Sequence, residues 1–390
     1  TPNLDAMAKA GATFTHCYSQ PLCTPSRVKL MTGLSNIRNY TSFGILPRGE
    51  TTFAHILQRA GYRTCVVGKW QLFGSRQERL PAGSGTLPAD AGFDEHLLWQ
   101  VDRIGSRYAD PLLVENGRYL ETTQGRYGPD VFADHAVDFI RRQRALDQRY
   151  LLYYPMALVH DPFDAPPGTD PGPEGKAGVQ HRFAAMMHYM DAVVGRILAA
   201  IDDNGGRERT LVLFVGDNGT GRAITSRCRG QDVQGGKGLP NDRGTHVPLF
   251  ARWPGTVPAN HRSDALVDFS DFLPTLCAAA AEPLPADLHP DGFSFLPQLR
   301  GEPGPTRDSI FVYYNPRPER PQFPRGRFAR DRRFKLYGDG RLYDLTADPE
   351  EERPLAGEAG DGEIAAARAK LAAAIARMPE HPLALPAEHR

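Results

Sequence analysis

The chain has 390 residues, and its 46 basic and 46 acidic side chains give a formal net charge of zero. This balance argues against a polybasic nucleic-acid or membrane surface, and no apolar run reaches the roughly 18 uncharged residues that a membrane-spanning helix needs. The apolar fraction of 41% is enough to bury a large core. We therefore expect a water-soluble protein with one large domain and a smaller one, no nucleic-acid partner and no membrane span.

The five cysteines are irregularly spaced and include no Cys-x-x-Cys pair. The spacing therefore indicates neither a disulfide framework nor a structural zinc site.

Helical and strand-like patterns alternate along most of the chain. A short helix is predicted over 3–11, apolar strands over 64–67, 150–154 and 211–215, and helices over about 131–146 and 182–202. Continuously apolar strands are typical of a parallel sheet that is buried on both faces. The pattern predicts an α/β protein whose central sheet is mostly parallel and is sandwiched by helices.

The pattern changes after about residue 302. Short β-like runs occur at 310–314, 333–337 and 341–345, with a Gly-Asp-Gly turn between the last two. An alanine-rich stretch over 362–378 is predicted to be helical. We expect an α/β catalytic domain over 1–302 and a C-terminal subdomain over 303–390 with a small antiparallel sheet and a helix.

Polar side chains follow the predicted strands at the points where the strands end. Lys69 follows the first strand, His160 lies shortly after the second, and Asp217 and Asn218 follow the third. In open α/β sheets ligands bind beyond the carboxyl ends of the strands. These strand ends are therefore candidate walls of a site, and the Pro-, Gly- and Asp-rich loop over 161–178 is a candidate rim.

The most informative motif is Cys23-Thr24-Pro25-Ser26-Arg27, which is followed by an apolar run and by Thr32-Gly33. An arginine near a cysteine lowers the pKa of the thiol and favours an anion there. A buried cysteine at the start of a helix is the alternative interpretation.

This motif resembles the signature of the sulfatase family of the alkaline phosphatase superfamily, in which Cys-x-Pro-x-Arg precedes Thr-Gly. In that family a maturation enzyme oxidises the cysteine to formylglycine, so the resemblance implies that Cys23 is the precursor of an aldehyde. Further matches follow in the family's order, at residues 1–5, 61–70, 247–255, 271–276, 291–299 and 341–345, the last with Asp348 and Pro349.

The resemblance also implies a divalent cation site. Asp217 and Asn218, together with the modified Cys23, would bind one Ca²⁺, which takes hard oxygen ligands. An Asp-Asn-Gly triplet by itself is more often a turn. The position of this triplet at the end of a strand favours the metal site.

The remaining roles concern the sulfate ester. The resemblance implies that Lys69 and Lys237 contact the sulfate or the leaving oxygen, that Arg27 holds the aldehyde hydrate, and that His160 protonates the departing alcohol. Gln71 would lie with Lys69, His160 and Lys237 against the substrate. One hydroxyl of the hydrate would attack sulfur and expel the alcohol, and loss of the proton from the other would release sulfate and restore the aldehyde.

The chain departs from the family pattern in two respects. Gln71 stands where the family usually has histidine, and an amide cannot take a proton at neutral pH. The family's pair of metal-binding aspartates lies upstream of the segment that begins at Thr1. We expect either that the sequence is truncated or that the protein is a natural defective relative. Truncation is favoured because loss of a central strand would cost core burial and metal affinity.

These observations predict a hydrolase that releases inorganic sulfate from a carbohydrate or aryl sulfate. Two alternatives remain open: a phosphonate or phosphodiester hydrolase of the same superfamily, and a non-catalytic relative that binds sulfated glycans. The resemblance further suggests a periplasmic or secreted location.

Overall fold

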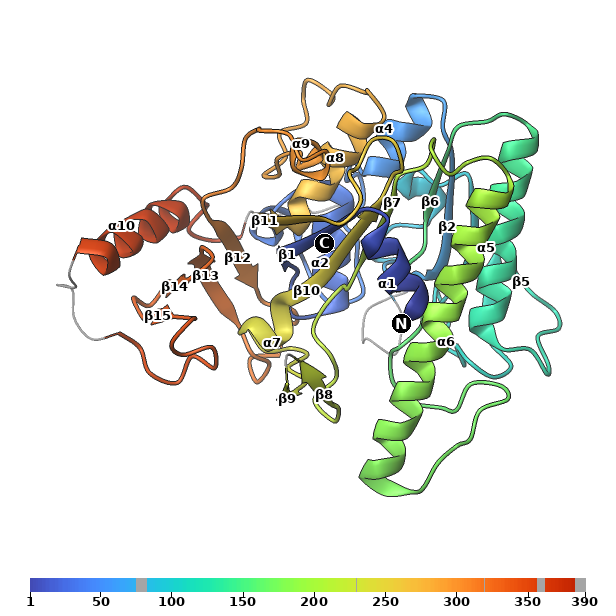
Figure 1. Cartoon of the computed structure of the whole chain (residues 1–390), viewed down its shortest axis with the longest axis horizontal. Coiled ribbons are helices and arrows are strands. Elements are labelled where there is room, and N and C mark those ends of the chain that lie inside the picture. Colours follow the sequence, from blue (N-terminus) through green and yellow to red (C-terminus); the bar gives the residue numbers. More distant parts are fainter. Residues whose placement is uncertain (75–82, 229, 319, 356–361, 383–390) are drawn as a thin grey trace.

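The computed structural model describes residues 1–74, 83–228, 230–318, 320–355 and 362–382. Two mixed sheets form its centre, one in the order β11-β1-β10-β7 and one in the order β5-β4-β3-β2-β6 (Figure 1). The strands of the first sheet are β1 (Ala12–Tyr18), β7 (Val212–Val215), β10 (His246–Arg252) and β11 (His261–Asp268). Those of the second are β2 (Arg63–Lys69), β3 (Glu95–Trp99), β4 (Leu113–Glu115), β5 (Arg118–Tyr119) and β6 (Tyr150–Tyr153).

Parallel pairing is found in both sheets. Strand β2 lies parallel to β3 and β6, and β1 lies parallel to β11. The pairs β1–β10, β10–β7, β3–β4 and β4–β5 are antiparallel. The sheets are therefore mixed, with parallel neighbours around β2, the strand that ends at Lys69.

Helices cover both faces of the sheets, which confirms the predicted α/β class. The helices are α1 (Pro2–Lys9), α2 (Cys23–Thr32), α3 (Asn36–Asn39), α4 (Phe53–Arg59), α5 (Gly128–Ala145), α6 (Gly175–Asp203), α7 (Asp242–Thr245), α8 (Phe272–Ala279) and α9 (Leu296–Leu299). Successive side chains of a strand point to opposite faces. Accordingly, Val66 of β2 packs in the core with α2, α4 and α8, whereas Cys65 and Val67 pack in the core with α1, α5 and α6.

Helix α6 is the one described helix that is long and apolar enough to cross a membrane by length and composition. It packs along α1 and α5, and its side chains Met186 and Met190 are buried in the core they share. The Asp191 carboxylate of α6 also accepts hydrogen bonds from the backbone N–H groups of Asn3 and Leu4. Buried side chains such as these account for part of the apolar character of α6.

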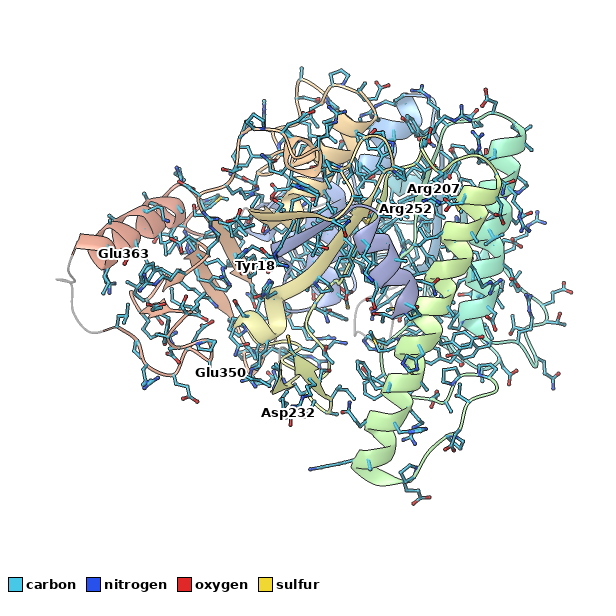
Figure 2. The ribbon with its side chains drawn as sticks, viewed as in Figure 1. Tyr18, Arg207, Asp232, Arg252, Glu350 and Glu363 are labelled. Carbon is cyan, nitrogen blue, oxygen red and sulfur yellow. The ribbon has the colours of Figure 1, made fainter. Side chains whose placement is uncertain are left out.

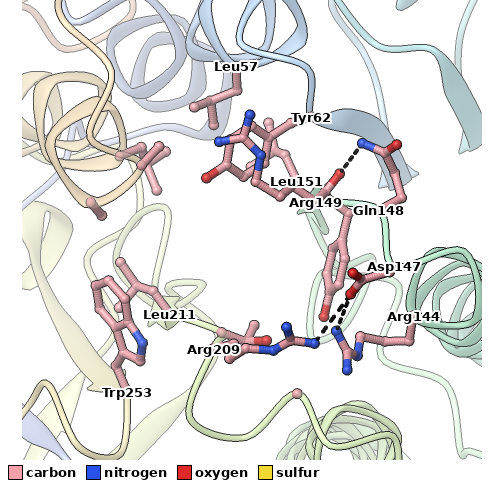
Figure 3. Close-up of a pocket in the computed structure, with 16 residues that line it drawn as sticks. Leu57, Tyr62, Arg144, Asp147, Gln148, Arg149, Leu151, Arg209, Leu211 and Trp253 are labelled. Carbon is pink, nitrogen blue, oxygen red and sulfur yellow. Dashed lines mark hydrogen bonds and ion pairs between the residues drawn. The ribbon is translucent and has the colours of Figure 1, made fainter.

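Strands β6 and β7 are less buried than the sequence predicts. Each ends its sheet, and their residues are all half-buried. A cavity of about 390 Å³ lies where the two strands begin, with Leu151 on one side and Leu211 on the other (Figure 3). The half-exposure follows from their position, because each strand pairs on only one side with the described residues.

The C-terminal part forms a separate antiparallel sheet. Its strands are β12 (Ile310–Tyr314), β13 (Gly326–Arg330), β14 (Phe334–Tyr337) and β15 (Leu342–Asp344), and α10 (Gly362–Ala376) packs on one face. At the junction with the larger part, the guanidinium of Arg330 lies 3.8 Å from the ring centre of Tyr18 (Figure 2). Tyr18 belongs to β1, so this contact ties the small sheet to the centre of the fold.

Candidate active site

Cys23 is the first residue of α2, and only 2% of its surface is exposed. Pro25 lies in the first turn of this helix, where a missing N–H group costs nothing because first-turn N–H groups have no partner in the helix. At the other end, Gly33 ends α2 in the left-handed conformation with φ of +70°. The signature motif thus forms a short buried helix that presents position 23 at its positive end.

Arg27 lies one turn after Cys23 on the same helix and is also buried. Its Nη1 donates hydrogen bonds to the backbone oxygens of Lys69 and Trp70. Its Nε and Nη2 are buried and have no hydrogen-bond partner among the described residues. Arg27 therefore joins α2 to the end of β2 and keeps two donors available for an anion.

Lys69 ends β2 and reaches the side chain of Cys23, with its Nζ 3.3 Å from Sγ. The preceding Gly68 has φ of +114°, and a Cβ there would lie 2.3 Å from the carbonyl oxygen of Pro155. Only glycine fits this contact. The close approach lets the Lys69 N–H donate to Pro155 at 2.8 Å, which brings the loop that carries His160 next to Lys69.

Lys237 and His160 form a second pair, with Nζ and Nε2 2.7 Å apart. Nδ1 of His160 lies 2.7 Å from the carbonyl oxygen of Asp161. Burial, together with the charges of Lys69, Lys237 and Arg107, lowers the pKa of His160 to about 3. The ring is therefore neutral at pH 7, with Nδ1–H donating to Asp161 and Nε2 accepting from the Lys237 ammonium.

The charges around position 23 favour an anion. Burial by itself would raise the pKa of the Cys23 thiol. The positive charge of Lys69, with smaller contributions from Arg27 and Lys237, outweighs both burial and the negative charge of Asp217, so the pKa lies below its ordinary value. Position 23 therefore lies in a net positive environment that suits a bound sulfate.

Asp217 and Asn218 follow β7, as predicted. The Oδ1 atom of Asn218 is buried without a hydrogen-bond partner, and the Asp217 carboxylate forms no ion pair with the described residues. Asp217 acts electrostatically on both Cys23 and Lys69, so it lies near them. Asp217 and the adjacent Asn218 thus offer unpaired oxygens that fit a hard divalent cation, although Ca²⁺ takes six to eight oxygen ligands.

Gln71, the residue in place of the family's histidine, also faces Cys23, with its Oε1 4.0 Å from Sγ. It lines a cavity of about 580 Å³ together with Lys69 and His160. The structure thus brings together the residues that the sequence singles out. The same cavity wall contains Trp99, Arg107, Arg317 and Phe43, which the sequence analysis missed because they lie in or beside irregular segments without a motif.

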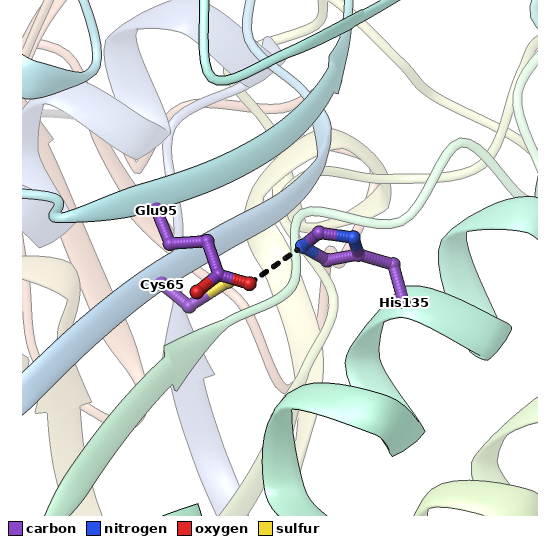
Figure 4. A group of neighbouring side chains, drawn as sticks. All are labelled: Cys65, Glu95 and His135. Atoms are coloured by element: carbon purple, nitrogen blue, oxygen red, sulfur yellow. Dashed lines mark ion pairs between the residues drawn. The ribbon is translucent and has the colours of Figure 1, made fainter. Parts of the chain in front are cut away.

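A separate group, Cys65, Glu95 and His135, lies on the other side of β2 from α2 (Figure 4). The candidate ligand atoms of these side chains are within 4.8 Å of one another. Glu95 already forms ion pairs with His135 at 3.2 Å and with Arg142 at 2.5 Å. The group therefore links the sheet to α5 through contacts already made by Glu95, and it differs from the predicted metal ligands.

Comparison with solved structures defines the class of fold. A structure in complex with its substrate D-glucosamine-2-N,6-O-disulfate is similar with a TM-score of 0.73 at 20% identity, over 97% of this chain and 92% of that one. The phosphonate monoester hydrolase of Agrobacterium radiobacter has a TM-score of 0.69 at 21% identity, over 97% and 90%. These similarities show the fold, which is of the α/β class, as expected.

Sequence comparison then defines the family. The family model "Sulfatase" matches residues 1–282, and "N-sulphoglucosamine sulphohydrolase, C-terminal" matches residues 237–378. Arylsulfatase A of Homo sapiens is 33% identical over 90% of this chain and 72% of its own length. Arylsulfatase G of Rattus norvegicus is 31% identical over 77% of this chain and 64% of its own length. The chain thus spans about two thirds of these curated relatives.

This chain belongs to the sulfatase family, a family of sulfuric ester hydrolases. The resemblance in the Cys23 motif is therefore confirmed as a family relationship.

Proposed function

We propose that this protein hydrolyses sulfate esters of carbohydrates and releases inorganic sulfate and an alcohol. One observation carries the proposal: Cys23 Sγ lies 3.3 Å from Lys69 Nζ at the start of α2, in a net positive environment. A cysteine in this position is at the right place to supply, as formylglycine, the oxygen that attacks sulfur. Family membership supports this chemistry at position 23.

Lys69 and Arg27 stabilise charge on the sulfate. Both are buried beside position 23, where fixed cations act more strongly than in water. The two unpaired nitrogens of Arg27 are the donors that a sulfate oxygen or the oxygen at position 23 would satisfy. The positive end of α2 adds to the same field.

Lys237 and His160 act on the leaving oxygen. In the free protein the shared proton is on Lys237, because His160 has a pKa of about 3. A sulfate ester beside the pair brings negative charge, which raises the pKa of His160 and favours transfer of this proton toward the ring. The pair thus holds one proton at the position from which the departing alcohol takes it.

Asp217, Asn218 and the oxygen at position 23 would hold a divalent cation, Ca²⁺ in our proposal. When bound, it would polarise a sulfate oxygen and increase the acidity of the hydroxyl at position 23. The unpartnered Oδ1 of Asn218 supports this assignment. Its remaining ligands would come from substrate, water or residues beyond these two.

The carbohydrate class of the substrate is supported by the cavity and by the relatives. The cavity combines aromatic side chains with polar groups, which suits sugar rings. The family that matches the C-terminal part is named for N-sulphoglucosamine, and one similar solved structure holds D-glucosamine-2-N,6-O-disulfate. These substrates of related proteins motivate the choice of sulfated sugars in the assays.

The test begins with the tryptic peptide from Ala10 to Arg27, after co-expression with a formylglycine-generating enzyme that converts a control sulfatase. We expect the mass of one aldehyde in place of one thiol, located at Cys23, with Cys17 in the same peptide unchanged. Sulfate release from an aryl sulfate and from sulfated monosaccharides is then measured for this protein and for Cys23→Ala. If the Cys23→Ala protein releases sulfate as fast as the converted protein does, the mechanism is overturned.

The same assay addresses the two alternatives. Faster release from an aryl phosphonate or phosphodiester than from the aryl sulfate would assign the protein to phosphonate or phosphodiester hydrolysis. Binding of sulfated glycans without turnover by the converted protein, and without dependence on metal, would assign it to the non-catalytic alternative, which Gln71 favours.

A further inference from the structure

Arg107 is an arginine without an acidic partner in the wall of the active-site cavity. Its Nη1 is buried and has no hydrogen-bond partner, and no acidic side chain among the described residues forms an ion pair with it. A buried guanidinium nitrogen without a partner costs free energy, so such groups usually bind a ligand or water. Arg107 therefore offers an unsatisfied positive charge to whatever enters the cavity.

The guanidinium of Arg107 is held in place by stacking. It lies 3.9 Å from the ring centre of Trp99, and Trp99 is itself fixed by a 2.8 Å hydrogen bond from its Nε1 to the carbonyl oxygen of Gly105. Stacking occupies the face of the guanidinium and leaves its edge for hydrogen bonds in the plane. An edge of this kind matches a carboxylate or a sulfate with two parallel hydrogen bonds.

Arg107 contributes less to the field at position 23 than the nearest charges do, although it also interacts electrostatically with Cys23. The charges that act most on Cys23 are those of Lys69, Asp217, Arg27 and Lys237. Arg107 does act on Lys69 and His160, so it lies within reach of the same ligand. Its position is that of a neighbouring subsite for a different part of the molecule that carries the reacting sulfate.

A second cation without an acidic partner lines the same cavity. Arg317 stacks 4.4 Å from the ring centre of Phe43, and no ion pair joins it to an acidic side chain in the described parts of the chain. The acidic residue in the cavity lining is Asp164. Cations therefore outnumber acids in this wall even beyond the group around position 23.

We propose that Arg107, stacked on Trp99, binds a second anionic group on the substrate, a carboxylate or a second sulfate on the same sugar or its neighbour. This inference rests on the proposed sulfatase function and narrows its substrate to carbohydrates with at least two negative charges. Arg317 supports the same preference as the second cation of the wall.

The binding test uses the full chain with the Cys23→Ala substitution, which cannot turn over under the proposed mechanism. The ligands are an N-acetylhexosamine 6-O-sulfate, the same sugar with an N-sulfate in place of the N-acetyl group, and a hexuronic acid with a single sulfate. We expect the two dianionic sugars to bind about tenfold more tightly than the monosulfate, the size expected for a charged hydrogen-bonded pair. The two dianions distinguish a carboxylate from a sulfate as the second group.

Arg107→Gln, added to the Cys23→Ala protein, should bring the affinity for each dianionic sugar close to the affinity for the monosulfate. Arg103→Gln is the matched control, since Arg103 is on the same segment, stacks on Tyr119 at 4.6 Å and has a side chain that is 68% exposed. The control should leave the ratio of these affinities unchanged. Equal loss of affinity for all three sugars in Arg107→Gln would overturn the inference and assign Arg107 to the reacting sulfate, and so would the absence of any preference before substitution.

The turnover test separates this inference from the proposed function. In the converted protein, Arg107→Gln should lower kcat/KM for the dianionic sugars relative to the monosulfate by about tenfold, mainly through KM. Absence of sulfate release from every sugar would contradict the proposed function, while the affinity ratio still decides the role of Arg107. A thermal midpoint that matches the parent protein confirms that the Arg107→Gln protein is folded.

Discussion

Lys237 Nζ lies 2.7 Å from His160 Nε2, although the two residues are 77 positions apart in the sequence. The contact fixes which side chain carries the proton. A lysine ammonium at hydrogen-bond distance disfavours a second positive charge on the ring, so His160 is the acceptor.

The first prediction concerns pH. Because the pKa of His160 is lowered to about 3, the ring stays neutral in the free protein from pH 5 to 8. A plot of kcat/KM against pH should therefore show no inflection from His160 near pH 6.5, the ordinary pKa of histidine. Lys237→Met removes one of the charges that lower the pKa, so the pKa should rise. NMR titration of the ring measures the rise, and Lys176→Met, at an exposed position of α6, is the control. An unchanged titration in Lys237→Met would contradict the assignment.

The second prediction concerns a buried ion pair between Lys29 of α2 and Asp268 at the end of β11. Nζ and Oδ2 are 2.7 Å apart, and the side chains are 2% and 4% exposed. Lys29→Met leaves a buried carboxylate without its main partner, which should lower the free energy of unfolding by about 3–5 kcal/mol. Urea unfolding at pH 7 measures the loss. The exposed pair of Arg332 and Asp264 is the control, and Arg332→Met should cost less than about 1 kcal/mol.

The same pair predicts the dependence of stability on pH. Burial would raise the pKa of Asp268, but Lys29 and Arg307 hold it below its ordinary value. A carboxyl with a lowered pKa contributes stability above its unfolded pKa of about 3.9, and this stability is lost as the pH falls through the folded pKa. In Lys29→Met the folded pKa rises, so acid unfolding should begin at a higher pH. An unshifted acid transition would mean that Lys29 does not set the charge of Asp268.

The third prediction concerns the cation. Asp217→Ala and Asn218→Ala each remove one oxygen ligand, so Ca²⁺ should raise the thermal midpoint of these proteins less than that of the parent protein. Asp232→Ala, at the exposed end of the β8–β9 hairpin (Thr225–Cys228 and Gln231–Gln234), is the control and should respond like the parent. The shift after addition of EDTA and then Ca²⁺ is measured for each. An equal response in all four proteins would place the cation elsewhere.

The elements that the sequence predicts are those with continuous apolar or helical periodicity, such as β2, α5 and α6. Strand β1 was missed although it is central, because Thr13, Thr15 and His16 interrupt its apolar character. Its partners are also distant in the sequence: Thr13 pairs with Phe250 and with Arg262. Pairings of this kind have no local signal.

Some residues of the candidate site can be predicted from the sequence and others cannot. Cys23, Arg27 and Lys69 could be named from the sequence because they lie in motifs, and the structure brings them together. Arg107 could not, because its importance depends on an irregular segment that stacks it on Trp99. The lowered pKa of His160 could not be predicted from the sequence either, since it depends on burial and on the approach of Lys237.

The last prediction concerns Gly68, which places the His160 loop beside Lys69. Its φ of +114° is unfavourable for other residues, and a Cβ would lie 2.3 Å from the Pro155 carbonyl oxygen. Gly68→Ala should therefore push the segment after β6 away from β2, weaken the hydrogen bond from Lys69 N–H to Pro155, and separate His160 from Lys69.

We expect turnover by the converted Gly68→Ala protein to fall at least tenfold, because small displacements of catalytic groups have large effects on rate. Gly117→Ala is the matched control: its φ is +82°, but a Cβ there would meet nothing within 4 Å. The control therefore carries the backbone strain, of order 1–3 kcal/mol, without the collision. If both proteins lose stability and only Gly68→Ala loses turnover, the loss arises from the displaced loop; equal turnover in the two would show that the contact with Pro155 does not position His160.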